Sequence, residues 1–220
     1  MENEMNARQG GFTGAQKRYL AVKRGIDFVL SLCAVIVLSP VLLVIALAVK
    51  LDSPGPVLFK QRRVGKDKEI FEIWKFRTMR TDTPGNMPTH LLKDPDRYIT
   101  KTGRFLRKSS LDELPQILQI LSGKMSIIGP RPALWNQYDL IAERDKGNSN
   151  ACPPGLTGWA QVHGRDELEI AEKAGYDNYY ADHISFGLDV KCFFATIVQV
   201  FRHEGVVEGG TGAMKEKAEK

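Results

Sequence analysis

Cysteine is scarce in this chain. Only three cysteines occur among 220 residues, at Cys33, Cys152 and Cys192, and no CxxC spacing is present. The odd number and the scattered positions argue against a disulfide scaffold and against a cysteine-based zinc site. We therefore expect the catalytic part of the protein to work in a reducing compartment.

Several catalytic and nucleotide-binding signatures are also missing. The sequence contains no GxGxxG, GxxxxGK[ST], GxSxG or HExxH pattern, and its four histidines show no metal-ligand spacing. These absences argue against Rossmann and Walker nucleotide sites and against a zinc protease. No nucleic-acid-binding module is recognisable, so we expect no nucleic-acid partner. The composition, 43% hydrophobic and 26% charged with a net charge of +5, excludes a disordered chain.

One long apolar run dominates the first quarter of the chain. Residues 28–49 form 22 consecutive uncharged, mostly apolar positions, enough to enter a membrane. A signal peptide fits poorly, because the run is long and begins far from Met1. A buried core helix is the alternative that the sequence leaves open.

The flanks and the centre of this run predict how it meets the membrane. Lysine and arginine occur on both sides, and the positive-inside rule places such residues in the cytoplasm. Ser39-Pro40 lies near the centre, where proline disrupts the helix and the serine hydroxyl can bond a freed carbonyl. We expect a re-entrant helix-break-helix hairpin with both ends cytoplasmic. A proline-kinked span remains the alternative.

The remaining chain predicts an α/β or α+β fold that is predominantly helical, with interfacial amphipathic helices beside the membrane. A breaker cluster, Asp52-Ser53-Pro54-Gly55-Pro56, ends the anchor. A basic hairpin is expected over 57–80, with its turn at Gly65-Lys66-Asp67. Helical patterns follow at 110–121, 136–146, 167–180 and 188–202. We assign four parts: a flexible N-terminus (1–16), the re-entrant anchor (17–56), a cytoplasmic catalytic domain (57–205) and a C-terminal tail (206–220).

The most reactive-looking segment contains adjacent carboxylates. Asp112 and Glu113 follow several basic side chains and precede Pro115, which predicts a helix start. One carboxylate can attack phosphorus and its neighbour can hold Mg²⁺, while nearby arginines neutralise phosphate oxygens. The competing interpretation is a capping box formed by Ser110 and Glu113.

Two further segments carry candidate anion ligands. Arg131 stands between two prolines, which restrict its backbone to extended conformations. Arg165 closes a glycine-punctuated run that begins at Pro154, and backbone amides beside glycine can hold phosphate. An ordinary rigid turn and an ordinary loop are the respective alternatives.

Taken together, the segments resemble the bacterial sugar transferases, the monotopic polyprenol-phosphate phosphoglycosyl transferases, in their minimal catalytic form. The matching pieces appear in order over residues 17 to 205: KRxxD at 23–27, Ser39-Pro40, DSPGPVLFKQRRxG at 52–65, KFRTM at 75–79, SLDELPQ at 110–116, MSIIGPRP at 125–132, PGLTGWAQ at 154–161 and SFxxD at 185–189.

The resemblance implies a two-step reaction. Asp112 would attack the sugar-bearing phosphate of a UDP-sugar and release UMP. Polyprenol (undecaprenyl) phosphate would then take the sugar phosphate, as the first membrane step of glycoconjugate synthesis. Glu113 would bind the cofactor Mg²⁺. The catalytic pair is therefore expected to be Asp112 and Glu113.

The resemblance also implies the substrate-binding residues and the location. Arg107, Arg131 and Arg165 would contact phosphate or nucleotide, and Asp189 and Arg77 are counted with them. Ser39 and Pro40 would form the kink of a re-entrant helix at the bacterial inner membrane. Expected partners are the UDP-sugar, polyprenol phosphate and membrane phospholipids, with a homodimer left open.

Two other functions are kept as alternatives. A membrane-bound glycosyltransferase would release UDP instead of UMP. A non-enzymatic anionic-lipid-binding protein would need neither the carboxylate pair nor Mg²⁺. The identity of the sugar is not readable from the sequence.

Overall fold

The computed structural model describes residues 11–83, 97–164 and 168–202. This part is mostly helical and contains two small sheets. Its elements are α2 (Gly14–Asp52), β1 (Leu58–Val64), η2 (Lys66–Lys68), β2 (Ile70–Phe76), α3 (Lys101–Lys108), η5 (Leu111–Glu113), α4 (Gln116–Leu121), β3 (Ser126–Ile128), α5 (Tyr138–Arg144), η6 (Ser149–Ala151), β4 (Gly155–Thr157), η7 (Gln161–His163), α6 (Ile170–Asp182) and α7 (Phe186–Arg202). The expected mixed, predominantly helical class is confirmed. The expected C-terminal tail lies outside the described residues.

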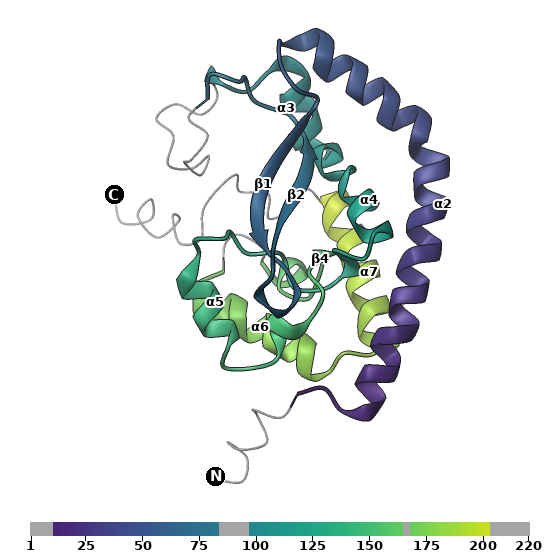
Figure 1. Ribbon diagram of the computed structural model, residues 1–220, viewed down its shortest axis with the longest axis vertical. Helices are drawn as coiled ribbons and strands as arrows, with labels where there is room; N and C mark the ends of the chain where they lie inside the picture. Colours follow the sequence, from purple (N-terminus) through teal and green to yellow (C-terminus); the bar gives the residue numbers. More distant parts are fainter. Residues whose placement is uncertain (1–10, 84–96, 165–167, 203–220) are drawn as a thin grey trace.

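Helix α2 contains the apolar run and is continuous through Pro40. It forms a bow along one side of the molecule (Figure 1). Pro40 has no amide hydrogen for the carbonyl of Ile36, four residues earlier. The Ser39 hydroxyl donates to that same carbonyl at 2.8 Å, as expected from the sequence. The expected break between two helices is wrong in detail. The hydrogen bond from the Ser39 hydroxyl replaces the missing backbone bond, so that one helix bends without ending.

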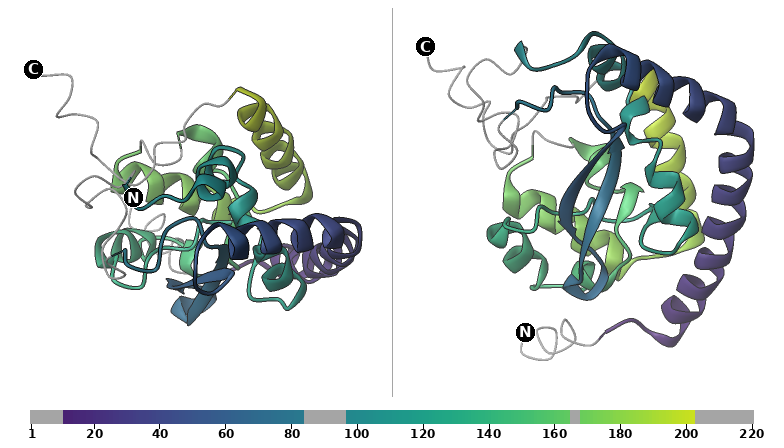
Figure 2. Two further views of the ribbon diagram at one scale, coloured as in Figure 1. Left: turned by 90° about the horizontal axis from the view of Figure 1, so that it is seen from above. Right: turned by 45° about the horizontal axis from the view of Figure 1, so that its top comes forward.

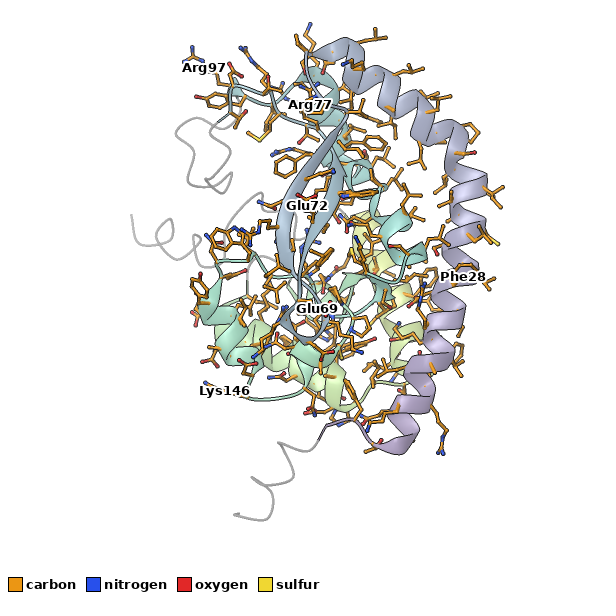
Figure 3. All side chains as sticks on the ribbon, in the orientation of Figure 1. Phe28, Glu69, Glu72, Arg77, Arg97 and Lys146 are labelled. Atoms are coloured by element: carbon orange, nitrogen blue, oxygen red, sulfur yellow. The ribbon has the colours of Figure 1, made fainter. Side chains whose placement is uncertain are left out.

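The outer surface of α2 is apolar and is exposed within the part of the chain that the structure describes. Its most apolar 18-residue window has a mean hydropathy of 3.0, yet only 11% of that window is buried. Side chains project away from the protein along this surface (Figure 3). Its exposed apolar residues include Ile36, Val37, Leu43 and Val44. A core helix would bury these groups. The core-helix alternative is therefore wrong, and the length and composition of α2 suit a membrane.

The first half of α2 is bound to the rest of the protein by polar contacts. Arg24 donates to the carbonyls of Ile120 and Leu121, both at 2.8 Å. These carbonyls lie at the end of α4, where helical acceptors lack internal partners. Asp27 is buried and accepts hydrogen bonds from the Ser126 hydroxyl at 2.7 Å and the Ile127 amide at 3.1 Å.

The other end of α2 is bound to the same body of the protein. Asp52 accepts a hydrogen bond from the Thr102 amide at 2.8 Å, at the start of α3. Arg77, just after β2, donates to the carbonyls of Ser53 at 2.7 Å and of Pro54. Figure 3 shows Arg77 at the end of the hairpin that lies beside this end of α2. Both ends of the apolar helix therefore contact one domain.

The expected basic hairpin is confirmed. Strands β1 and β2 pair antiparallel, from Leu58 opposite Phe76 to Val64 opposite Ile70. Asp67 and Lys68 adopt positive φ angles of 52° and 64° in the turn. On the inner face, Ile73 packs with Ile120 and Met125 in one of the hydrophobic clusters. This packing holds the hairpin against α4, as the two further views also show (Figure 2).

The later helices follow the sequence patterns closely. Helices α5, α6 and α7 confirm the expected helices, with ends that differ by a few residues. In α7, Leu188 and Cys192 are buried while Phe193 and Phe194 are exposed. One face of α7 is therefore core, and its role as an interfacial helix stays a prediction. The expected helix over 110–121 is wrong in its first part, because η5 and α4 replace a single helix.

Candidate active site

The adjacent carboxylates lie in a tight turn that precedes α4. Ser110 adopts a left-handed conformation, with φ 54°, and its side chain makes no capping hydrogen bond. The capping-box interpretation is therefore wrong. Asp112 and Glu113 occupy the 3-10 turn η5, and Pro115 stands at the N-cap of α4. Because the 3-10 turn is tighter than an α-helix, the two carboxylates sit on a short, sharply turned segment between α3 and α4.

Glu113 is held by two cations from distant segments. Its Oε1 accepts a hydrogen bond from Lys75 Nζ at 2.8 Å and from Arg131 Nη2 at 2.9 Å. The Glu113 side chain is only 12% exposed. Burial alone would raise the pKa of this carboxyl, but Arg131 and Lys75 outweigh burial and hold the pKa well below its usual range. Glu113 is therefore a permanent anion at neutral pH.

Asp112 has the opposite electrostatic character. Its side chain is partly accessible, and burial with the neighbouring Glu113 charge raises its pKa, against the opposing effects of Lys75 and Arg107. Carboxylates that share a site separate their pKa values in this way. Asp112 is the more basic of the two groups and is partly exposed, and both properties suit a nucleophile.

Arg107 is positioned beside Asp112 by the packing of α3. Gly103 lies against the Thr78 backbone, and a side chain at Gly103 would collide with the Thr78 carbonyl. One turn later, Arg107 Nε donates to the Thr78 hydroxyl at 2.8 Å. The predicted residue Arg107 is thus supported by Thr78, and its charge acts to lower the pKa of Asp112 in the Asp112–Glu113 dyad.

Arg131 reaches the dyad from a loop whose backbone is held at four successive carbonyls. The Pro130 carbonyl accepts from the Gly155 amide at 2.9 Å, and the Ala133 carbonyl accepts from the Val64 amide at 2.9 Å. Between them, the Arg131 carbonyl accepts from Arg144 at 2.9 Å and the Pro132 carbonyl from Arg63 at 3.1 Å. These hydrogen bonds hold the backbone on both sides of Arg131, in addition to the restriction expected from the two prolines.

Sequence reasoning missed Lys75 and Thr78 as site residues. Both belong to the KFRTM motif at 75–79, but neither residue was assigned a role at the site on the basis of sequence. The available signal was the hairpin register, which pairs Lys75 with Phe59 and separates its face from that of Trp74. That register shows which basic side chains share a face, but not which face meets Glu113.

The structure places Arg77 away from the dyad. Its guanidinium is buried and bonds the backbone carbonyls at the end of α2. In this position Arg77 caps the C-terminal end of the apolar helix. Its expected role in substrate binding stays a prediction.

Asp189 is likewise occupied by structural partners. Its Oδ2 accepts from Lys23 Nζ at 2.5 Å and from the Tyr19 hydroxyl at 2.6 Å. Its Oδ1 accepts from the Tyr180 hydroxyl at 2.6 Å. The buried carboxylate forms a polar link between α2, α6 and α7. Its expected contact with substrate stays a prediction. Arg165 lies outside the described residues.

The site contains acceptors suited to a metal that is shared with a phosphate. Among the described residues, no group of three or more histidine, cysteine, aspartate or glutamate side chains could hold a metal. Mg²⁺ commonly uses only one or two carboxylates, with water and substrate phosphate supplying the rest. Both cations bond Oε1 of Glu113, and no described residue donates to Oε2. The residues present therefore fit a substrate-shared Mg²⁺.

Comparison with known proteins agrees with this geometry. The chain matches the bacterial sugar transferase family over residues 18–203. It is 41% identical over 187 residues to a UDP-glucose:undecaprenyl-phosphate glucose-1-phosphate transferase of Escherichia coli, covering 82% of this chain and 40% of that protein. It is 39% identical to the uncharacterized sugar transferase EpsL of Bacillus subtilis, covering 85% of this chain and 91% of EpsL.

A third relative has a comparable length. The exopolysaccharide production protein PSS of Rhizobium leguminosarum is 40% identical over 191 residues, covering 81% of this chain and 94% of PSS. The matched segment includes α2 from residue 18 onward, the dyad and the loop of Arg131. The chain therefore belongs to the bacterial sugar transferase family.

Proposed function

We propose that the protein is a phosphoglycosyl transferase that moves a sugar 1-phosphate from a UDP-sugar to polyprenol phosphate. The observation that carries this proposal is the dyad itself. An accessible, more basic Asp112 lies next to an ionised Glu113 that Lys75 and Arg131 hold in place. Charge stabilisation by fixed cations is the main requirement of phosphoryl transfer.

The reaction proceeds in two steps. In the first, a carboxylate oxygen of Asp112 forms a bond to the sugar-bearing phosphorus. The bond from that phosphorus to the bridging oxygen breaks, and UMP leaves with the bridging oxygen. In the second step, a phosphate oxygen of polyprenol phosphate attacks the same phosphorus. The Asp112 carboxylate is released, and the product is a polyprenol diphosphate sugar.

The cations around the dyad have separate roles in this proposal. Arg107, supported by Thr78, lies beside Asp112 and neutralises the phosphate under attack. Arg131 and Lys75 orient Glu113, and their positive charges would offset the negative charge of the phosphate. Glu113 would hold Mg²⁺, which when bound neutralises phosphate charge and favours departure of UMP.

The contacts of α2 support a re-entrant membrane topology. Arg24 and Asp27 fasten one half of α2 to the catalytic domain, and Asp52 and Arg77 fasten its end to the same domain. A helix that crossed the bilayer would carry its two ends to opposite sides. We propose that the bend at Pro40 enters one leaflet and that both ends remain cytoplasmic, which places the dyad near the head groups of the lipid substrate.

Identification of the released nucleotide tests this function. Purified protein in nanodiscs receives Mg²⁺, polyprenol phosphate and a panel of UDP-sugars, and the uridine product is identified by chromatography. We expect UMP with at least one sugar, and no UMP from Asp112→Asn. The Asp112→Asn variant should keep the wild-type melting temperature, because Asp112 has no structural hydrogen bond that asparagine cannot replace.

The control and the contrary outcomes separate the alternatives. Asp145→Asn, which changes an exposed carboxylate far along the chain, should retain full activity. Release of UDP would favour a conventional glycosyltransferase. Normal UMP release by Asp112→Asn would contradict the nucleophile, and intact-mass detection of a phosphosugar on wild-type protein but not on this variant would support it.

A further inference from the structure

A buried ion pair lies behind the loop that carries Arg131. Arg144, at the end of α5, directs Nε and Nη2 to Oδ2 of Asp177 in α6, at 3.0 and 2.6 Å. The two side chains are 4% and 1% exposed. The same Nη2 also donates to the Arg131 carbonyl at 2.9 Å. The pair therefore connects α5 and α6 to the backbone of a residue that contacts Glu113.

Stability alone is a weak explanation for this pair. Two buried charges lose their hydration, and well-packed apolar residues of similar size are often as stabilising or more so. Asp177 Oδ1 has no hydrogen-bond partner among the described residues, which adds to the cost. Burial also raises the pKa of Asp177 despite the opposing effect of Arg144. An apolar pair would lack the hydrogen bond that Arg144 donates to the Arg131 carbonyl.

We infer that Arg144, oriented by Asp177, is a positioning residue for Arg131 in the proposed reaction. Asp177 holds the Arg144 guanidinium in one orientation, and Arg144 holds the Arg131 carbonyl. This contact fixes the rotation of the Arg131 backbone and hence the direction of its side chain. Nη2 of Arg131 then meets Oε1 of Glu113 at 2.9 Å. The inference rests on the proposed function and assigns no substrate contact to Arg144 itself.

The position of Arg131 is sensitive to this support because its side chain is long. A small rotation about the backbone at Arg131 is amplified at the guanidinium, several bonds away. Displacements of about 1 Å at a catalytic group can cost about 100-fold in rate. The neighbouring donors, Arg63 and the amide of Gly155, hold the flanking carbonyls and not that of Arg131 itself. Arg144 is therefore the support closest to the functional side chain.

The test replaces the pair with apolar residues. The double variant Arg144→Met, Asp177→Leu removes both charges together, so neither is left uncompensated. We expect a melting temperature within about 4 °C of wild type, equivalent to about 1 kcal/mol. We expect kcat/KM for UMP release to fall about 10- to 100-fold. A purely structural pair would leave kcat/KM close to the wild-type value once folding is preserved.

A mutant cycle gives a readout that loss of stability would not produce. Arg131→Ala is introduced into wild type and into the double variant. If Arg144 acts through Arg131, most of the effect of Arg131→Ala should already be present in the double variant. The fold-loss in kcat/KM of the combined variant should then be well below the product of the two separate fold-losses. Full multiplication of the two losses would overturn the inference, as would a wild-type rate in the double variant.

Two further variants complete the experiment. Lys146→Met removes an exposed ion pair with Glu143 just beyond the end of α5, at the periphery seen in Figure 3, and should leave activity unchanged. If the double variant does not fold, Arg144→Lys takes its place, because lysine keeps the charge but lacks the planar fork. The same non-multiplicative cycle is then expected.

Absence of Asp112-dependent UMP from wild type would contradict the proposed function, whereas the outcomes above contradict only the positioning role.

Discussion

At the scale of single residues, charge pairs decide which ionisable groups are available for chemistry. Asp112 and Glu113 are neighbours in sequence, yet their pKa values move in opposite directions because only Glu113 receives direct bonds from Lys75 and Arg131. Asp189 is an equally acidic residue in the sequence, but its oxygens are used by Lys23 and two tyrosines. The partners of a carboxylate, and not its residue type, separate a reactive group from a structural one.

A stability measurement tests this distinction for Asp189. In Asp189→Asn the buried Lys23 loses its counter-charge, and removal of one partner from a buried pair typically costs about 3–5 kcal/mol. We therefore expect a clear fall in the melting temperature in nanodiscs. Adding Lys23→Met should recover much of the loss, because no buried cation is then left without a partner. Asparagine can accept a hydrogen bond from one tyrosine hydroxyl and donate one from its amide nitrogen to the other. If Asp189→Asn kept wild-type stability but lost UMP release, the result would support Asp189 as a substrate ligand.

At the scale of elements, α2 combines a helix-breaking residue with a local repair. Pro40 leaves the Ile36 carbonyl without its helical donor, and the Ser39 hydroxyl replaces that donor. The helix therefore bends (Figure 1) and can bring both ends back to one domain. The bend is a property of two adjacent residues, although its consequence is visible only over the length of the helix.

Replacement of Ser39 and Pro40 should straighten α2. In the double variant Ser39→Ala, Pro40→Ala the normal backbone hydrogen bond forms again, and a straight helix cannot keep the contacts at both ends. We expect a lower melting temperature in nanodiscs and movement of the N-terminal end toward the opposite side of the membrane, measured by labelling of a cysteine at position 18. Leu43→Ala, at an exposed apolar position of the same helix, is the matched control. Unchanged stability and labelling would contradict the role of the bend.

At the scale of the whole molecule, the two ends of α2 and the catalytic site belong to one body. This arrangement predicts that Arg18 before the apolar run and Lys66 in the hairpin turn face the same side of the membrane. Single cysteines at these exposed positions, in a Cys33→Ser background, should both react with a charged maleimide from the cytoplasmic side. Labelling from opposite sides would show that α2 spans the bilayer.

The two remaining cysteines should not react with the maleimide in that experiment. Cys152 and Cys192 are buried, and burial raises the pKa of each thiol to about 12. A raised thiol pKa leaves almost no reactive thiolate near neutral pH. Unfolding in detergent exposes both groups, lowers their pKa values toward the ordinary range and should restore labelling. Reaction of either thiol in the folded protein would contradict the packing around α6 and α7.

The sequence alone determined the features that depend on neighbouring residues. The uncharged run predicted an apolar membrane helix, and Ser39-Pro40 predicted a disruption at its centre, where the structure has a continuous helix that bends. Alternation predicted the β1–β2 hairpin. The order of its motifs also pointed to the correct family. Each of these signals is local, because periodicity, chain breakers and motif spacing act within a few residues.

Only the tertiary structure decided which distant groups meet. Lys75 and Arg131 converge on Glu113 from segments 38 and 18 residues away. Arg77 and Asp189 match the family pattern equally well, yet they bind α2 and not the dyad. A long, flexible, charged side chain has several partners within reach in an unfolded chain. The packing of α3, α4, the hairpin and α2 selects one of them, because that packing determines which backbone positions lie close enough to pair.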